Sequence, residues 1–113
     1  MVQKKYLNKQ LKEFLKNLTE DIKVDEIILF GSRANGNAKK DSDVDLIIVS
    51  KDFEEMNFFE RVSKMYDYWK IDLPVDFLCY TSKEFEKLKK GITIVSEALK
   101  KGVVFQNPVV IKN

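Results

Sequence analysis

Two aspartates separated by a single residue constrain this chain more than any other feature of its sequence. Asp43 and Asp45 stand at the start of the apolar run Leu46–Val49, whose composition predicts a β-strand. Side chains alternate between the faces of a strand, so the two carboxylates are expected to project together while Val44 points away. Negative charges on one face repel each other unless a cation lies between them, and Mg²⁺ prefers oxygen ligands of this kind. The pattern therefore predicts a site for a divalent metal ion.

A phosphate-binding turn is predicted shortly before the two aspartates. The apolar run Ile27–Phe30 ends abruptly at Gly31-Ser32, and a polar loop that carries lysines follows it. Glycine lets the backbone approach a ligand closely, and Ser32 offers a hydroxyl and a backbone N–H where a helix could begin. A phosphate cradle opposite a metal site with two carboxylates is suited to the transfer of a nucleotidyl group.

The spacing of these residues resembles a known family signature. Gly31-Ser32, ten intervening residues and Asp43-x-Asp45 resemble the G-S-x₁₀-D-x-D pattern of the polymerase-β-like nucleotidyltransferases. The fuller string GSRAxG…DSDVDL resembles a short branch of that superfamily, the minimal nucleotidyltransferases (MNT). The resemblance covers nearly the whole chain and departs from the family at Asn35, where many relatives carry a second arginine.

This resemblance implies a fold and a set of site residues. The implied fold is α/β, a small mixed β-sheet flanked by helices, as in polymerase-β-like nucleotidyltransferases. Asp43 and Asp45 would bind Mg²⁺, with two ions expected in all, and Gly31 and Ser32 would hold the β- and γ-phosphates of ATP. For Arg33, a phosphate contact and a salt-bridged structural role both remain open. Lys39 and Lys40 are expected to be solvated loop charges, although a contact of either with the triphosphate is not excluded.

A third acid lies inside another apolar run. Asp76 falls within Val75–Tyr80, which Pro74 opens and which predicts a strand. An acid in an apolar strand is costly unless it is paired or acts as a ligand, so either a salt bridge to a lysine or a role in the metal site would explain it. We favour the metal site, because the family carries its third catalytic acid on such a strand. Asp72, before the proline, is the competitor and lies outside the strand.

The composition excludes several classes of site. The chain has no histidine, which removes Ser-His and Cys-His nucleophile pairs, imidazole bases and His-ligated zinc. A net charge of +2 does not favour direct nucleic-acid binding. The single Cys79 cannot form an internal disulfide, and no apolar run reaches membrane-spanning length. We therefore expect a cytoplasmic protein without membrane association, folded as one domain over residues 1–113.

Hydrophobic periodicity and turn residues predict the remaining elements. The expected helices are Lys4–Thr19, a short one after Ser32, a helical pattern between Asp52 and Lys70, one capped at Thr81, and Ile94–Lys101; the expected strands are Asp25–Phe30, Leu46–Val49, Val75–Tyr80 and a short one within Gly102–Gln106.

The helical pattern between Asp52 and Lys70 carries an aromatic stripe. Phe58 or Phe59, together with Tyr66 and Trp69, recurs at helical spacing. We interpret the stripe as core, but it contains more rings than one helix face can easily bury, so a partner surface is the alternative.

The acceptor of the nucleotidyl group is expected to come from a partner, because a chain of 113 residues has no room for a further acceptor-binding domain. Members of the MNT branch pair with HEPN-domain proteins as toxin–antitoxin systems. The resemblance therefore implies a protein adenylyltransferase antitoxin that transfers AMP from ATP to a tyrosine of a HEPN-type toxin. Two alternatives remain open. One is a binding module that neutralises its partner by contact alone, and the other is transfer to a different hydroxyl.

Overall fold

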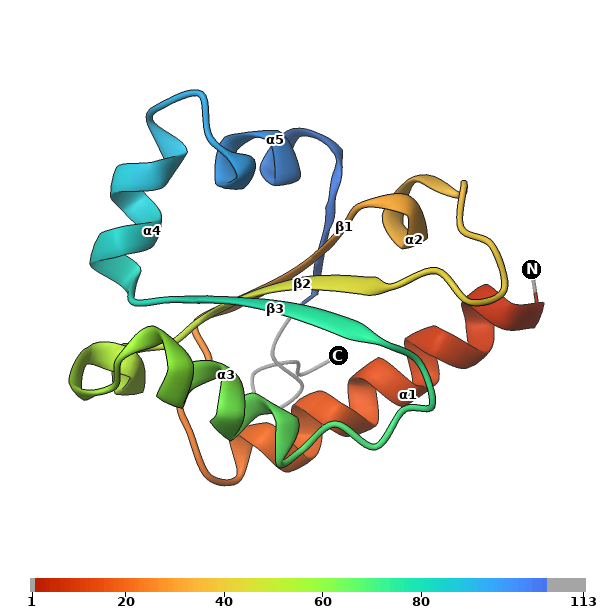
Figure 1. The fold of residues 1–113 in the computed structure, drawn as a ribbon, viewed down its shortest axis with the longest axis horizontal. Coiled ribbons are helices and arrows are strands. Elements are labelled where there is room, and N and C mark those ends of the chain that lie inside the picture. Colours follow the sequence, from red (N-terminus) through yellow and green to blue (C-terminus); the bar gives the residue numbers. More distant parts are fainter. Residues whose placement is uncertain (1, 106–113) are drawn as a thin grey trace, which may run out of the picture.

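The structure, a computed structural model, describes residues 2–105, with side chains described for residues 7–104. Its elements confirm the predicted α/β class, with helices on both sides of a small sheet (Figure 1). The helices are α1 (Val2–Thr19), α2 (Ser32–Asn35), the 3₁₀ helix η1 (Lys51–Glu55), α3 (Phe58–Tyr66), α4 (Ser82–Lys89) and α5 (Ile94–Lys101). The strands are β1 (Glu26–Phe30), β2 (Val44–Val49), β3 (Val75–Tyr80) and β4 (Val103–Phe105).

The four strands form one mixed sheet in the order β3-β2-β1-β4. β1 runs antiparallel to both β2 and β4, whereas β2 and β3 are parallel. Parallel neighbours need a crossover connection, and the segment that contains η1 and α3 provides it. Asp43 and Pro74, the residues that precede β2 and β3, are exposed, so both strands begin at a surface open to water.

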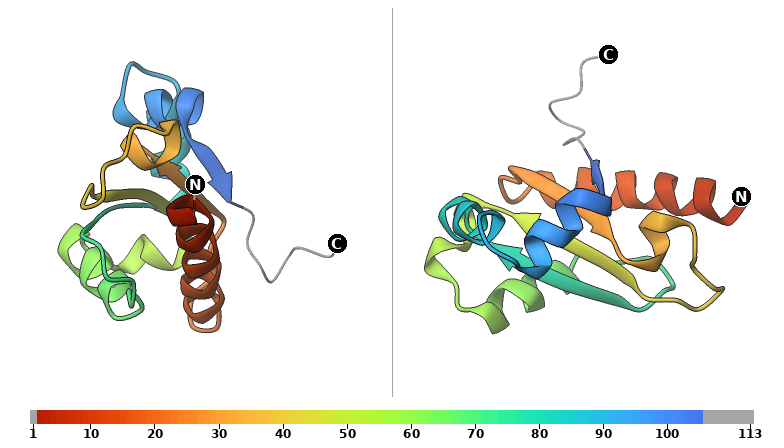
Figure 2. Two further views of the ribbon diagram at one scale, coloured as in Figure 1. Left: turned by 90° about the vertical axis from the view of Figure 1, so that its right-hand side faces the viewer. Right: turned by 90° about the horizontal axis from the view of Figure 1, so that it is seen from above.

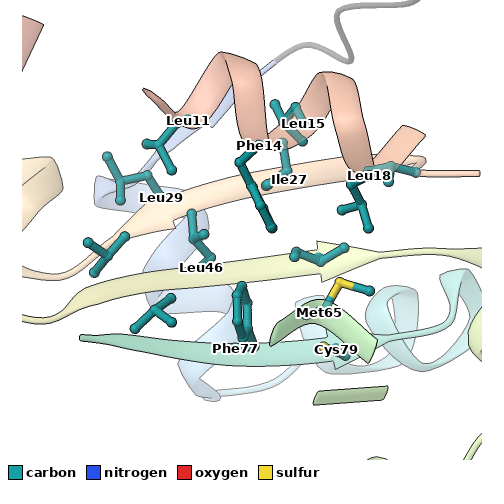
Figure 3. Close-up of a cluster of buried hydrophobic side chains, with 14 of the residues drawn as sticks. Leu11, Phe14, Leu15, Leu18, Ile27, Leu29, Leu46, Met65, Phe77 and Cys79 are labelled. Atoms are coloured by element: carbon teal, nitrogen blue, oxygen red, sulfur yellow. The ribbon is translucent and has the colours of Figure 1, made fainter. Parts of the chain in front are cut away.

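Two apolar layers hold the sheet between the helices. Alternation along β2 sends Val44, Leu46 and Ile48 into a core shared with α1 and α3, and sends Ile47 and Val49 into a core shared with α4 and α5. Figure 2 shows α1 on one side of the sheet and α4 and α5 on the other. In the larger core, side chains of α1 point down onto the strands, as Figure 3 shows. The helix predicted from Lys4 to Thr19 is thus confirmed.

The segment between Asp52 and Lys70 differs most from its prediction. Its only α-helix is α3, preceded by the 3₁₀ helix η1. Asn57 separates the two, because its side chain accepts a hydrogen bond from the Glu60 amide while the Glu60 carboxylate accepts one from the Asn57 amide. This capping box begins a new helix within the stretch whose hydrophobic residues recur at helical spacing. The capping box predicted at Thr81 is confirmed, with Glu84 as its partner.

The aromatic stripe is divided between core and surface. Trp69 packs edge-on against Phe14 and Phe77, as a core residue would. Phe58 and Phe59, however, are 60% and 79% exposed, so the core interpretation is wrong for them. None of the helices within residues 2–105 is long and apolar enough to cross a membrane.

Arg61 is a charged residue whose side chain is buried, and nothing in the sequence around it predicted that burial. Its Nε donates to the carbonyls of Phe53 and Met56, and its Nη1 donates to the Cys79 carbonyl and to the Glu84 carboxylate. The hydrogen bond from Arg61 is the main reason why the pKa of Glu84 is lowered. A single guanidinium therefore joins η1, α3, β3 and α4 at the end of β3 far from Asp76.

Candidate active site

The paired strands β2 and β3 bring two of the predicted acids together. Asp45 of β2 and Asp76 of β3 are Cα partners in the parallel ladder, and neighbouring strands lie only about 4.8 Å apart. Both side chains project from the face that α4 and α5 cover further along the sheet, opposite to the Val44 side. Asp43 precedes β2 by one residue and shares this alternation. The predicted placement of Asp76 on a strand beside Asp45 is confirmed.

Gly31 lies directly against the Asp45 carboxylate. The antiparallel pairing of Phe30 with Asp45 brings the end of β1 to this point. Gly31 has φ +75° and ψ −158°, a conformation that is essentially restricted to glycine. A Cβ atom at this position would clash with Asp45 Oδ2 and would lie 3.2 Å from Asp45 Cγ. Glycine is therefore required here both for its backbone and for the space that the carboxylate occupies.

The short helix α2 begins immediately after this glycine. Ser32 is its first residue, half-buried, and helix geometry leaves the first amides of α2 without carbonyl partners inside the helix. The Gly31 carbonyl accepts hydrogen bonds from the amides of Ala34 and Asn35, which fixes the turn. Gly36 ends the helix in the left-handed conformation. Amides that face outward at a helix start can bind phosphate oxygens, as the sequence predicts for Gly31 and Ser32.

Arg33 holds the loop that leads to the acids. Its Nη2 donates to the carbonyls of Lys40 and Ser42, at 3.1 and 2.9 Å, and its Nε donates to the Ser42 carbonyl. The Ser42 hydroxyl in turn accepts a hydrogen bond from the Lys39 amide. Of the two roles left open for Arg33, a phosphate contact and a salt-bridged structural role, the structure shows a structural role, but through carbonyl hydrogen bonds and not through a salt bridge. Its part in phosphate binding stays a prediction.

The three neighbouring carboxylates repel one another, which favours the binding of a cation between them. Burial raises the pKa of the Asp45 carboxyl above its ordinary value of 3.8, and the negative charges of Asp76 and Asp43 and a hydrogen bond with Asp76 raise it further. Within the described residues, none of these three acids forms an ion pair with a lysine or arginine. The salt bridge considered for Asp76 is therefore absent among the described residues. The repulsion between the carboxylates can be relieved by a bound proton or by an external cation.

The donor set fits Mg²⁺ in the form that phosphate-transferring sites use. Among the described side chains, no three acidic or thiol groups converge tightly enough to enclose a metal ion by themselves. Mg²⁺ rarely needs such a cage, because one or two carboxylates, substrate phosphates and water usually complete its coordination. Asp45 and its neighbours Asp43 and Asp76 would supply those carboxylates beside the Gly31 turn. Whether one or two ions bind stays a prediction.

A cavity of about 310 Å³ lies elsewhere, between α1, the loop after α2 and the segment before β3. Its lining includes Gln10, Arg33, Lys40 and Asp72, but none of the three acids. The acids instead lie at an open end of the sheet, where Asp43 and Asp76 are exposed and Asp45 is half-buried. Asp72 therefore belongs to the cavity and does not replace Asp76 as the third acid.

Comparison with known proteins gives one family. The family model described as a nucleotidyltransferase domain matches residues 9–105. A Thermococcus cleftensis protein named protein adenylyltransferase MntA is 36% identical over 88 residues, which cover 74% of this chain and 81% of that protein. A Haemophilus influenzae protein named probable protein adenylyltransferase MntA is 37% identical over 78 residues, which cover 66% of this chain and 67% of that protein.

Two solved structures share the fold. A Sulfolobus solfataricus protein assigned as a nucleotidyltransferase superimposes with a TM-score of 0.69 at 24% identity, covering 95% of this chain and 86% of that one. A toxin–antitoxin crystallised with AMP-PNP superimposes with a TM-score of 0.57 at 20% identity, covering 82% of this chain and 70% of that one. At these identities the likeness concerns the fold.

Two glycines allow the contact between Gly31 and Asp45 to be tested against a matched control. Gly31 and Gly36 both have positive φ, but a Cβ at Gly36 would meet nothing within 4 Å. Gly36→Ala should therefore cost only the backbone term, about 1 kcal/mol. Gly31→Ala places a side chain in a backbone conformation that is essentially restricted to glycine and adds the clash with the carboxylate, so it should cost about 3 kcal/mol or more. Urea unfolding of both variants measures the difference, and equal losses would mean that Gly31 is not packed against Asp45.

The crowding of the acids predicts a pH-dependent gain of stability in Asp45→Asn. Folding raises the pKa of the Asp45 carboxyl above its ordinary value of 3.8. Below pH 3.8 the carboxyl is protonated in both the folded and the unfolded state, so it does not affect stability. As the pH rises through the folded pKa, the ionised carboxylate destabilises the folded protein. Without metal, Asp45→Asn should unfold at higher urea concentration at pH 7, by on the order of 1 kcal/mol, and should lose this advantage near pH 3. Asp41→Asn, at an exposed turn, is the control expected to show no change. A destabilised Asp45→Asn at pH 7 would show that the carboxylate is structural.

Proposed function

Because this chain belongs to the nucleotidyltransferase domain family, we propose that it transfers AMP from ATP to a tyrosine hydroxyl of a HEPN-type toxin partner. As a member of the family it is a transferase enzyme, and the proposal concerns its substrates. The donor is ATP, the expected cofactor is Mg²⁺, and the acceptor belongs to another protein. The chain would thereby act as the antitoxin of the pair.

One observation carries the proposal, namely the in-register pairing of Asp45 with Asp76 beside the Gly31 turn. The turn offers amides to phosphate oxygens on one side of the site. The carboxylates offer negative oxygen ligands on the other. A nucleoside triphosphate with its divalent cation matches both halves, because its phosphates accept hydrogen bonds and its cation needs carboxylates.

The chemistry follows from this placement. The tyrosine oxygen attacks the α-phosphorus of ATP, the bond from that phosphorus to the bridging oxygen breaks, and pyrophosphate leaves with that oxygen. Asp43 and Asp45 would hold the nucleotide's metal, and Asp76 would either complete the metal site or accept the phenolic proton. A phenol with a pKa of about 10 needs only modest help to ionise. A bound divalent metal supplies charge neutralisation at the phosphates.

The choice of acceptor is supported by the relatives. Both MntA proteins are named as protein adenylyltransferases, and a fold neighbour was crystallised as a toxin–antitoxin. The HEPN class of the partner and the tyrosine acceptor come from the resemblance of the sequence to the MNT branch. The described residues leave Phe58 and Phe59 exposed, so apolar surface is present for a partner, although it is not tied to a particular one.

Intact-mass spectrometry of the toxin tests this proposal. After incubation with this protein, ATP and Mg²⁺, the toxin should gain the mass of one or more whole AMP groups and lose its activity, because a bulky anion is added at its site. Tryptic fragments should place the modification on a tyrosine.

A double variant provides the control. Asp43→Asn with Asp45→Asn should stay folded, bind the toxin and leave its mass unchanged, because the metal ligands are lost. If the wild-type protein, mixed with the toxin, ATP and Mg²⁺, neutralises the toxin without shifting its mass, the protein acts by contact alone and the transfer proposal fails.

A further inference from the structure

The third acid lies on a strand that is supported from one side only. Within the described residues, β3 has β2 as its single strand neighbour. The carbonyls of Pro74 and Tyr80 accept hydrogen bonds from the β2 side. Because backbone groups alternate along a strand, the carbonyls of Val75 and Cys79 point to the outer edge. The position of Asp76 therefore depends on what holds this edge.

Tyr66, the last residue of α3, contacts that edge on both sides of Asp76. Its hydroxyl donates to the Val75 carbonyl at 2.8 Å. Its ring packs edge-on against Phe77, with centroids 5.2 Å apart and planes at 84°. Asp76 is the residue between these two contacts. Its carboxylate projects from the other face of the sheet, since Phe77 belongs to the core under α1 and α3.

The hydroxyl of Tyr66 is not explained by packing. The side chain is about half exposed, and a phenylalanine would make the same ring contact with Phe77. What the hydroxyl adds is a hydrogen bond to an edge carbonyl. Arg61 makes a similar bond to the Cys79 carbonyl at 3.1 Å, so α3 holds β3 near both of its ends. Only the bond from Tyr66 lies next to the acid.

We propose that Tyr66 is a positioning residue for nucleotidyl transfer, which sets the place of Asp76 by fixing the Val75 carbonyl. The inference rests on the proposed function, and of the two roles given there to Asp76 it takes the one in which Asp76 accepts the phenolic proton. Tyr66 lies on the opposite face of the sheet from the carboxylates, so it is not a catalytic residue. Its contacts are with Val75 and Phe77 of β3, whereas the Gly31 turn, Asp43 and Asp45 would hold ATP and its metal. Its loss should therefore lower kcat while leaving the KM for ATP unchanged.

The variant Tyr66→Phe removes the hydroxyl and keeps the ring. We expect kcat for transfer of labelled AMP to the toxin to fall about 3- to 10-fold, the effect of one neutral hydrogen bond. The KM for ATP should stay within about twofold of the wild-type value, because the contacts that bind ATP are unchanged. In the free protein, the backbone amide of Asp76, which faces β2, should exchange its hydrogen faster than in the wild type.

Tyr68→Phe is the matched control. Tyr68 follows α3, and its hydroxyl hydrogen-bonds to the Asp21 carboxylate, away from β3. This variant should keep the wild-type kcat and the wild-type exchange of the Asp76 amide. An unchanged kcat in Tyr66→Phe, an equal loss in Tyr68→Phe, or a change in KM for ATP without a change in kcat would overturn the proposal.

The exchange measurement separates this inference from the proposed function. If the wild-type protein transfers no AMP to the toxin, the proposed function fails, and hydrogen exchange alone decides the role of Tyr66. Faster exchange at Asp76 in Tyr66→Phe would then uphold the claim that Tyr66 fixes the strand around the acid. Unchanged exchange would overturn it.

Discussion

The parallel pairing of β2 with β3 is the interaction on which the rest of the structure depends. Parallel strands cannot be joined by a tight turn, so the chain must cross one face of the sheet through η1 and α3. With α1 on that face and α4 and α5 on the other, the strands are buried along most of their length. Where β2 and β3 begin, Asp43 and Asp76 are exposed and Asp45 is half-buried. The same pairing that builds the core therefore places Asp45 and Asp76 together at its open end.

Negative charge and a backbone conformation specific to glycine are found together at this end of the sheet. Gly31 adopts a backbone conformation that other residues avoid, and burial together with neighbouring carboxylates raises the pKa of Asp45. Such features persist because the surrounding core determines where the strands lie. Arg33 fixes the loop between the turn and the acids by hydrogen bonds to backbone carbonyls. A cation would replace the repulsion among these carboxylates by a favourable contact, which is the expected property of a site organised before its substrate arrives.

The sequence predicted well those elements whose ends are marked by a proline or a helix-capping residue. β3 begins after Pro74 as predicted, and α4 begins at the capping box of Thr81. The prediction of a helical pattern between Asp52 and Lys70 was less accurate. The hydrophobic periodicity continues through Asn57, the cap that separates η1 from α3. The burial of Arg61 had no local signal, because it depends on Cys79 and Glu84, which lie 18 and 23 residues further along the chain. For the site, the acids and the turn could be read from their spacing. The contact of Gly31 with a carboxylate could not, because it depends on the register between β1 and β2.

We propose that the open end of β2 and β3 holds a nucleotide's phosphates and its metal. A crystal structure with a non-hydrolysable ATP analogue, and with Mn²⁺ in place of Mg²⁺ for its anomalous signal, would test this proposal. We expect a Mn²⁺ peak bonded to Asp43 and Asp45, with the triphosphate against the amides that follow Gly31. A nucleotide seated instead in the cavity beside α1, with the acids free of metal, would contradict it.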